Sequence, residues 1–210
     1  MNPSSKILAG KKIIFLGSSV TYGAASQGVS FVDFLTSHDQ CVVYKEAVSG
    51  TTLVDDGPDS YISRMKKLQV SKADLFVCQL STNDATQKKT LGTIASSTDP
   101  TDFDTHTITG AIEYVIAYAR RTWNCPIAFY TNPPYADDNY RCMVERLSSI
   151  AEKWGISVFD LWDNESFNCI SEEQYNLYMD DPIHPTRTGY LEWWLPEFER
   201  RLEQLISVIE

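Results

Sequence analysis

Asp181 and His184 lie three residues apart in a segment that reads Asp-Pro-Ile-His-Pro. A histidine oriented by a carboxylate makes up two thirds of a hydrolytic triad, because the carboxylate fixes the imidazole tautomer and stabilises the imidazolium. Pro182 and Pro185 restrict the residue before each of them to extended backbone, which predicts a stiff loop. The spacing therefore predicts an acid–base pair that could activate a hydroxyl nucleophile.

Ser19 is the candidate for that nucleophile. It lies in the segment Gly-Ser-Ser-Val-Thr-Tyr-Gly, residues 17–23, directly after a short apolar run that is typical of a strand. A serine hydroxyl is a poor nucleophile until a base removes its proton, which would be the task of His184. Thr21 stands where the second glycine of a Gly-x-Ser-x-Gly nucleophile elbow belongs, so the segment differs from that of an α/β-hydrolase.

The elements that must position these residues alternate between two periodicities. The predicted strands are the apolar runs 12–16, 41–44, 75–80, 127–130 and 156–159. Amphipathic helices are predicted over 106–123, 139–154 and 186–209, and Pro196 predicts a kink or two abutting helices in the last. This alternation predicts an α/β fold, a three-layer α/β/α sandwich with a parallel sheet.

Polar residues follow the predicted strands at the edge where ligands bind in such folds. They are Ser18, Ser19, Ser49, Gly50, Thr51, Ser81, Thr82, Asn83, Asp84, Asn132 and Tyr135, with Asp181 and His184 beyond the fifth strand. The sequence therefore predicts that all candidate catalytic groups share one edge of one sheet. Tyr135 is a candidate for the substrate pocket, and Asp84 is expected to be structural.

Four of these segments, in this order, resemble the four sequence blocks of the SGNH hydrolases, the GDSL-type esterase and lipase superfamily. The blocks are Gly17-Ser18-Ser19, Ser49-Gly50-Thr51-Thr52, Ser81-Thr82-Asn83-Asp84 and Asp181 to His184. The resemblance implies a single hydrolase domain over residues 1–210, with a five-stranded, flavodoxin-like parallel sheet.

The same resemblance implies a role for each matching residue. Ser19, Asp181 and His184 correspond to the catalytic triad. The backbone N–H groups of Ser19 and Gly50 and the side-chain amide of Asn83 correspond to the oxyanion hole. The chain departs from the family pattern at two positions, because Ser18 replaces the usual aspartate of the first block and Ser81 replaces the glycine of the third.

Three classes of function fit these residues. The first is a serine esterase that forms an acyl-enzyme on Ser19 and removes short acyl groups, such as O-acetyl groups on a carbohydrate, or longer acyl chains as lipases and thioesterases do. The second is a flavodoxin-like protein that binds a nucleotide or flavin phosphate at residues 17–23, although neither a Walker lysine nor Gly-x-Gly-x-x-Gly is present. The third is an inactive relative that only binds sugars, which the intact Ser, Asn and His positions disfavour.

Composition narrows the partners to small molecules. The chain has 210 residues, of which 43% are hydrophobic, and a formal net charge of −10, so it lacks the basic surface that nucleic acids and anionic membranes attract. The five cysteines include no close Cys-x-x-Cys pair, and no metal or other cofactor is expected. With neither a signal peptide nor a membrane span in the sequence, we expect a cytoplasmic protein.

The polar stretch 86–105 could be a lid or an insertion.

Overall fold

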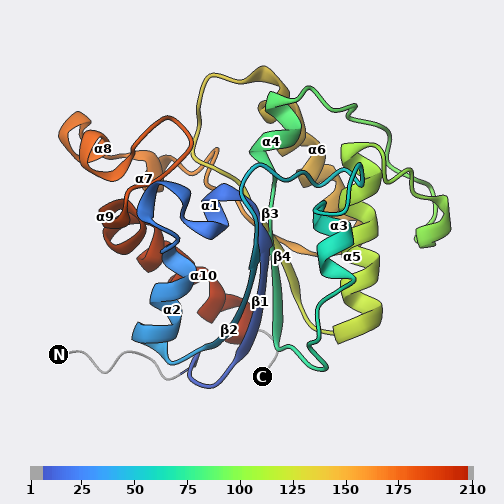
Figure 1. Ribbon diagram of the computed structural model, residues 1–210, viewed down its shortest axis with the longest axis horizontal. Coiled ribbons are helices and arrows are strands. Elements are labelled where there is room, and N and C mark those ends of the chain that lie inside the picture. The colour runs from blue at the N-terminus through green and yellow to red at the C-terminus, as the bar shows by residue number, and fades with distance from the viewer. Residues whose placement is uncertain (1–6, 208–210) are drawn as a thin grey trace.

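The computed structural model of the protein describes residues 7–207 and contains a five-stranded sheet whose strands all run parallel. The strand order is β2-β1-β3-β4-β5, and helices cover both faces (Figure 1). The strands are Lys12–Gly17 for β1, Val42–Ala47 for β2, Leu75–Gln79 for β3, Ile127–Tyr130 for β4 and Ser157–Phe159 for β5. The predicted α/β/α architecture is confirmed.

The helices follow the strands in the predicted alternation. The longer ones are α2 (Phe31–Asp39), α5 (Ile108–Trp123), α6 (Asp138–Trp154) and α10 (Leu195–Ser207). The shorter ones are α1 (Ser19–Tyr22), α3 (Tyr61–Met65), α4 (Thr82–Thr86), α7 (Glu165–Asn168), α8 (Glu172–Tyr178) and α9 (Arg187–Gly189). Two 3-10 turns occupy Ala24–Ser26 and Pro100–Asp102. Across residues 7–207, no helix is both long and apolar enough to cross a membrane.

The sheet separates two hydrophobic cores, and β1 contributes to both. Ile13 and Phe15 pack in the core that contains α2 and α10, whereas Ile14 and Leu16 pack in the core that contains α3, α5 and α6. Successive side chains of a strand point to opposite faces, so each face of β1 is buried. Because both faces of the sheet are covered, β3 and β4 are buried at every position, which is why they read as apolar runs, with Gln79 at the end of β3 as the exception.

Element boundaries differ from the prediction where side chains cap or extend an element. Helix α5 begins at Ile108 rather than at residue 106, because the Thr107 hydroxyl accepts a hydrogen bond from Gly110 N–H at 3.2 Å and caps the helix. Strand β2 runs on to Ala47, beyond the apolar run that predicts it, because it pairs with β1 along its whole length.

The C-terminal helix passes through Pro196 without ending. A π-helical turn over Tyr190–Trp194 joins α9 to α10, and Pro196 lies in the first turn of α10. Proline cannot donate a hydrogen bond to the preceding turn, and a wider turn at this point accommodates that missing bond. The predicted interruption therefore takes the form of a π-helical turn. Residues 208 and 209 of the predicted helix lie outside the described residues.

The polar stretch 86–105 is anchored to the layer formed by α5 and α6. The carboxylate of Glu113, which is fully buried in α5, accepts a hydrogen bond from Ala95 N–H at 2.9 Å and pairs with Lys153 of α6. The Lys153 ammonium also donates to the carbonyls of Ala95 and Ser97 at 2.7 Å each. Phe103, within this stretch, is buried in the core that contains α5 and α6, so the stretch packs against these helices.

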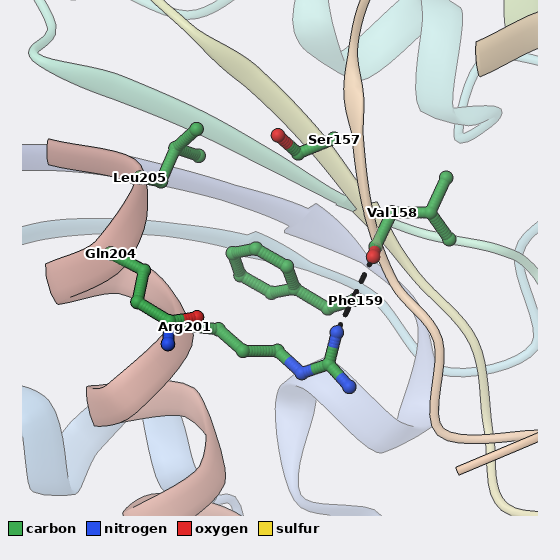
Figure 2. A pocket seen from close by; sticks show the side chains of 6 residues that line it. All are labelled: Ser157, Val158, Phe159, Arg201, Gln204 and Leu205. Carbon is green, nitrogen blue, oxygen red and sulfur yellow. Dashed lines mark hydrogen bonds between the residues drawn. The ribbon is translucent and has the colours of Figure 1, made fainter. Parts of the chain in front are cut away.

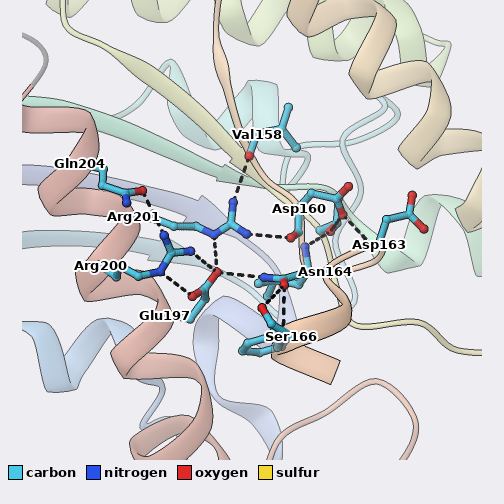
Figure 3. A network of polar contacts seen from close by, with 12 residues as sticks. Val158, Asp160, Asp163, Asn164, Ser166, Glu197, Arg200, Arg201 and Gln204 are labelled. Atoms are coloured by element: carbon cyan, nitrogen blue, oxygen red, sulfur yellow. Dashed lines mark hydrogen bonds and ion pairs between the residues drawn. The ribbon is translucent and has the colours of Figure 1, made fainter. Parts of the chain in front are cut away.

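Strand β5 forms one edge of the sheet, and Arg201 of α10 covers part of its free side (Figure 2). The Arg201 guanidinium donates to the carbonyls of Val158 at 3.4 Å and Asp160 at 3.0 Å. Glu197 holds it in place by accepting from Arg201 Nε at 2.6 Å, and it also pairs with Arg200 (Figure 3). The hollow beside them, about 300 Å³, is lined by Ser157, Val158, Phe159, Arg201, Gln204 and Leu205.

Candidate active site

Ser19, His184 and Asp181 form one chain of hydrogen bonds at the carboxyl-terminal edge of the sheet. Ser19 is the first residue of α1, just beyond β1, and His184 lies shortly before α9. His184 Nε2 is 2.8 Å from Ser19 Oγ, and His184 Nδ1 is 2.8 Å from Asp181 Oδ2. The imidazole thus faces a hydroxyl with one nitrogen and a carboxylate with the other, which is the geometry of a Ser-His-Asp triad.

Asp181 holds both the imidazole and the turn that carries it. Its Oδ1 accepts from Ile183 N–H at 2.7 Å and from His184 N–H at 2.8 Å. Partial burial opposes ionisation of Asp181, but the hydrogen bonds from the His184 ring and the two N–H groups outweigh it and lower the pKa of the carboxyl. Asp180, the other acid of this turn, has an exposed side chain and contributes its backbone N–H to His184 O.

The turn is also held from outside. Asn132, buried just beyond β4, donates from Nδ2 to Ile183 O at 3.0 Å. An antiparallel bridge between Met179 and Pro185 closes the base of the turn. These contacts tie the histidine loop to the end of β4, at the same edge of the sheet as the end of β1.

Gln79, the last residue of β3, organises the start of α1. Its Oε1 accepts from Ser18 N–H at 2.9 Å, from Thr21 N–H at 3.3 Å and from the Thr21 hydroxyl at 2.8 Å. Ser18 occupies the N-cap position but makes no capping bond with its own side chain, so the Gln79 carbonyl supplies the acceptor that an aspartate there would provide. Gly17 is required beside it, because an added Cβ would lie 1.8 Å from Thr21 Oγ1.

Gly50 and Asn83 lie on the loops that follow β2 and β3. Gly50 adopts a φ of +82°, a conformation that favours glycine. Asn83 Nδ2 donates to Thr51 O at 2.9 Å, which ties the amide to the loop of Gly50. The N–H groups of Ser19 and Gly50 donate to no acceptor within residues 7–207, and one Nδ2 proton of Asn83 remains for a ligand. These are donors of the kind that an oxyanion hole uses.

Asp84 fixes the Gly50 loop from the buried side. Its carboxylate accepts from Leu53 N–H at 2.7 Å and from Val54 N–H at 3.1 Å. Burial raises the pKa of Asp84, although these hydrogen bonds act in the opposite direction. Ser81 caps α4 by accepting from Asp84 N–H at 3.4 Å, so the serine that replaces the glycine of the third block supports the helix that presents Asn83.

A cavity of about 190 Å³ adjoins the Gly50 loop. It is lined by Gly50, Thr51, Thr52, Asp56, Gly57, Pro58, Asp59, Ser60 and Gln87. Within it, Asp56 accepts from the Thr52 hydroxyl at 2.9 Å and pairs with Lys89, while the side chains of Asp59 and Gln87 are exposed. The cavity is therefore rich in hydrogen-bonding groups and borders the loop that carries Gly50.

Tyr135 packs into an aromatic cluster. Its ring centroid lies 5.1 Å from that of Tyr140 and 5.6 Å from that of Trp162, and its hydroxyl is buried. A role of Tyr135 in substrate binding stays a prediction. His38 and His106 are exposed, and no group of three or more His, Cys, Asp or Glu side chains within residues 7–207 is arranged to hold a metal ion.

Sequence reasoning assigned no role to Gln79 or to Arg64, the buried arginine of α3, and it placed Asn132 at the sheet edge without a specific contact. Gln79 does carry a signal, because a fully buried amide ends a strand that is otherwise apolar. Asn132 stands at a strand end, where a polar residue is expected to face the ligand, but its partner on the histidine loop lies 51 positions away. Arg64 has no signal in the sequence, since its acceptors come from four separate segments.

The sequence matches a family of known proteins, and the fold is similar to those of solved structures. Residues 15–191 match the GDSL-like Lipase/Acylhydrolase family, and no curated protein is significantly similar to the sequence. Among solved structures, a Lactobacillus plantarum protein has a TM-score of 0.72 at 17% identity, covering 95% of this chain and 98% of its own. A GDSL-like lipase from Bacteroides ovatus has a TM-score of 0.69 at 18% identity. The match covers 93% of this chain and 99% of the Bacteroides protein.

A third similar structure is a family two carbohydrate esterase from Clostridium thermocellum, solved in complex with cellohexaose. Its TM-score is 0.61 at 14% identity, and the match covers 91% of this chain and 64% of the esterase. At such identities these likenesses show the fold. The family match spans most of the chain and includes every segment of the site, from Ser19 to His184. The chain therefore belongs to the GDSL-like lipase/acylhydrolase family of the SGNH hydrolase superfamily.

Proposed function

We propose that the protein is a serine esterase that hydrolyses carboxylic esters through an acyl-enzyme on Ser19. The observation that carries the proposal is the hydrogen-bond chain from Ser19 Oγ through His184 to Asp181, with 2.8 Å at each step. Both distances lie within the range that proton transfer and ring orientation require. Family membership supports a hydrolase that acts on esters.

In the first half-reaction, Ser19 Oγ attacks the ester carbonyl carbon while its proton moves to His184 Nε2. Asp181 accepts the Nδ1–H bond and stabilises the imidazolium that forms. The carbonyl oxygen becomes an oxyanion, which accepts hydrogen bonds from Ser19 N–H, Gly50 N–H and Asn83 Nδ2. Collapse of this intermediate breaks the bond to the alcohol, which leaves with the proton from Nε2.

The second half-reaction repeats these steps with water. His184 Nε2 removes a proton from water as the oxygen attacks the acyl carbon on Ser19. The same donors receive the second oxyanion, and Ser19 regains its proton when the acid is released. Since the lowered pKa of Asp181 keeps its carboxylate ionised at neutral pH, the imidazole keeps its orientation through both half-reactions.

The substrate class we propose is a short acyl group, such as acetyl, on a polar alcohol such as a carbohydrate. The cavity beside Gly50 supports this choice, because Asp59, Gln87 and Asp56 offer it acceptors and donors for hydroxyl groups. At about 190 Å³ the cavity has room for one small polar group. The fold is shared with a carbohydrate esterase of Clostridium thermocellum, which is consistent with such a substrate.

Longer acyl chains are the second candidate, and two exposed side chains favour them. Tyr22, at the end of α1, is 42% exposed, and Val48, just beyond β2, is 40% exposed. Both lie on segments next to the end of β1, since Val48 N–H donates to Gly17 O. Apolar surface near the nucleophile could receive an acyl chain, so the length profile of hydrolysed esters is the measurement that separates the two candidates.

Phosphate binding at residues 17–23 is disfavoured by the contacts of this turn. The backbone N–H groups of Ser18 and Thr21 already donate to Gln79 Oε1. Helix α1 is only four residues long, so it provides little dipole for an anion. A flavin-binding protein would also be yellow when purified, which absorbance at about 450 nm would reveal.

The test is hydrolysis of p-nitrophenyl acetate, butyrate and octanoate by the wild type, by Ser19→Ala and by Ser37→Ala, a control at an exposed serine. We expect Ser19→Ala to lose about four orders of magnitude in kcat or more, and Ser37→Ala to match the wild type. Acetate hydrolysed faster than octanoate, together with release of acetate from acetylated cello- or xylo-oligosaccharides, supports the short-acyl proposal. Equal rates for Ser19→Ala and the wild type would overturn the proposal that the protein is an esterase acting through Ser19.

A further inference from the structure

Arg64 is a buried arginine whose hydrogen-bonding capacity is completely used. Its side chain is 6% exposed, and its guanidinium lies 5.2 Å from the centroid of the Tyr61 ring. Nε donates to Asp59 O at 2.9 Å, and Nη1 donates to Glu46 O at 3.0 Å and to the Glu46 carboxylate at 3.1 Å. Nη2 donates to Gly17 O at 2.8 Å and to Thr51 Oγ1 at 3.0 Å. These five bonds match the five N–H donors of the group.

The acceptors of Nη2 belong to the two segments that must meet at the oxyanion. Gly17 ends β1 and lies two residues before Ser19, while Thr51 directly follows Gly50. One planar nitrogen therefore bridges the strand that presents the nucleophile and the loop that presents Gly50 N–H. Because a guanidinium directs its donors along fixed lines, it sets the relative position of these segments more narrowly than a flexible ammonium could.

Thr51 extends the connection to the third donor. Its hydroxyl accepts from Arg64 and donates to Val48 O at 2.7 Å, so the hydroxyl is held from two sides. Its carbonyl accepts from Asn83 Nδ2 at 2.9 Å. A continuous path of hydrogen bonds thus runs from the Ser19 segment through Arg64 and Thr51 to the Asn83 amide.

We propose that Arg64 is a positioning residue for the oxyanion hole, acting through the Thr51 hydroxyl. The proposal rests on the proposed esterase function, in which Ser19 N–H, Gly50 N–H and Asn83 Nδ2 receive the oxyanion. Such donors accelerate the reaction only when they are fixed before the charge develops, and a shift of about 1 Å can lower the rate on the order of 100-fold. Arg64 touches no reacting atom. It fixes the positions of those three donors relative to one another.

A purely structural role would have a different signature. Burying a guanidinium removes it from water, and only one of the groups that receive its hydrogen bonds is a carboxylate, that of Glu46. A charge buried in this way contributes little net stability compared with an apolar side chain. A structural arginine would change the fraction of folded protein, whereas a positioning arginine changes kcat in protein that is fully folded.

The decisive pair of variants is Thr51→Val and Thr51→Ser. Valine keeps the β-branched shape but removes the acceptor for Arg64, and serine keeps the hydroxyl. With p-nitrophenyl acetate, we expect Thr51→Val to lower kcat about 10- to 100-fold with KM changed less than about twofold, and Thr51→Ser to stay within about threefold of the wild type. Affinity for a small alkylboronic acid, which forms a tetrahedral adduct on serine, should fall by a similar factor in Thr51→Val.

Arg64→Lys provides the second measurement. Lysine keeps the charge but cannot bridge Gly17 O and Thr51 Oγ1 with one planar group, so kcat should again fall about 10- to 100-fold while the pH profile keeps its shape. Circular dichroism and the thermal midpoint measure the folded fraction of each variant. If Arg64→Lys does not fold, the Thr51 pair decides alone.

The outcomes separate this proposal from the proposed function. Loss of activity in Ser19→Ala, together with wild-type kcat and boronate affinity in folded Thr51→Val, would overturn the positioning role and leave the esterase intact. Equal losses in Thr51→Val and Thr51→Ser would also overturn it, since the hydroxyl would then not be the connection. Retention of activity in Ser19→Ala would overturn the esterase, and the positioning role would fall with it.

Discussion

The two carboxylate oxygens of Asp181 have different partners: Oδ1 accepts from backbone N–H groups, and Oδ2 faces the His184 ring. Catalysis should therefore be sensitive to replacement of this carboxylate by an amide. In Asp181→Asn, the carbonyl oxygen can still accept from the Ile183 and His184 N–H groups, which leaves the amide NH₂ facing His184 Nδ1. Nδ1 must then accept a hydrogen bond, so the ring proton moves to Nε2 and the base can no longer take the Ser19 proton. We expect kcat for p-nitrophenyl acetate to fall by about 10² to 10⁴ with little change in KM.

Asp180→Asn is the matched control, because that neighbouring side chain is exposed and makes no contact with the ring. It should retain wild-type kcat. If Asp181→Asn kept more than a third of the wild-type kcat, the carboxylate would have no part in orienting the imidazole.

The fold could be predicted element by element where burial dictates the sequence. Strands β1, β3 and β4 are covered on both faces, so each reads as an apolar run and was predicted within one residue of its bounds. Strand β2 lies at an edge and includes Lys45 and Glu46, whose polarity hid its last three residues. The register with β1, which decides where β2 ends, is a contact between segments and leaves no trace in local periodicity.

The candidate site divides in the same way. Ser19, Gly50, Asn83 and His184 could be placed because they follow strands, and parallel strands end at one edge. The contacts of Gln79 and Arg64 could not be placed, because they join residues that are 61 and 47 positions apart and depend on how helices pack on the sheet. The sequence therefore predicts which groups meet at the edge, whereas packing determines what holds them there.

At the scale of the elements, the ion pair between α5 and α6 should stabilise the fold without contributing to catalysis. In Lys153→Met, the fully buried Glu113 carboxylate would lose its cation and keep only the N–H groups of Trp154 and Ala95. We expect the free energy of unfolding to fall by about 3 kcal/mol or more, measured by urea denaturation. Specific activity of the folded fraction should not change, because Glu113 and Lys153 contact no residue of the triad or of the candidate oxyanion hole.

Two further variants identify the cause of that loss. Lys88→Met, at an exposed lysine, should leave stability within about 0.5 kcal/mol of the wild type. Replacing both partners, Glu113→Leu with Lys153→Met, should be less destabilising than Lys153→Met alone, because no buried charge remains unpaired. A double variant as unstable as the sum of its parts would contradict this explanation.

At the scale of the whole molecule, the pair of acids Asp39 and Glu199 adds a pH dependence to the free energy of unfolding. Partial burial, together with the charge of Asp39 at the end of α2, raises the pKa of Glu199 in α10 to about 7. The folded state therefore holds a proton that the unfolded chain releases near the ordinary glutamate value of 4.5. The contribution of this group is favourable at low pH and is lost as pH rises from about 4.5 through about 7.

Glu199→Gln removes this titration. We expect the variant to be more stable than the wild type at pH 8 and to lose that advantage at pH 5, as read from urea midpoints at both values. Glu152→Gln, at an exposed glutamate of α6, should show the same difference from the wild type at both pH values. A constant difference for Glu199→Gln across the range would mean that Glu199 does not carry the raised pKa.

The guanidinium of Arg201 has a consequence that reaches beyond the single molecule. An edge strand with unpaired carbonyls is a template on which another chain can add a strand. Arg201 occupies two of those carbonyls, at Val158 and Asp160, and so obstructs growth of the sheet from one molecule into the next. Arg201→Ala should self-associate with rising concentration in sedimentation velocity, whereas Arg200→Ala, which leaves the edge covered, should sediment as the wild type does. A salt bridge on α10 would thus keep separate copies of this protein apart.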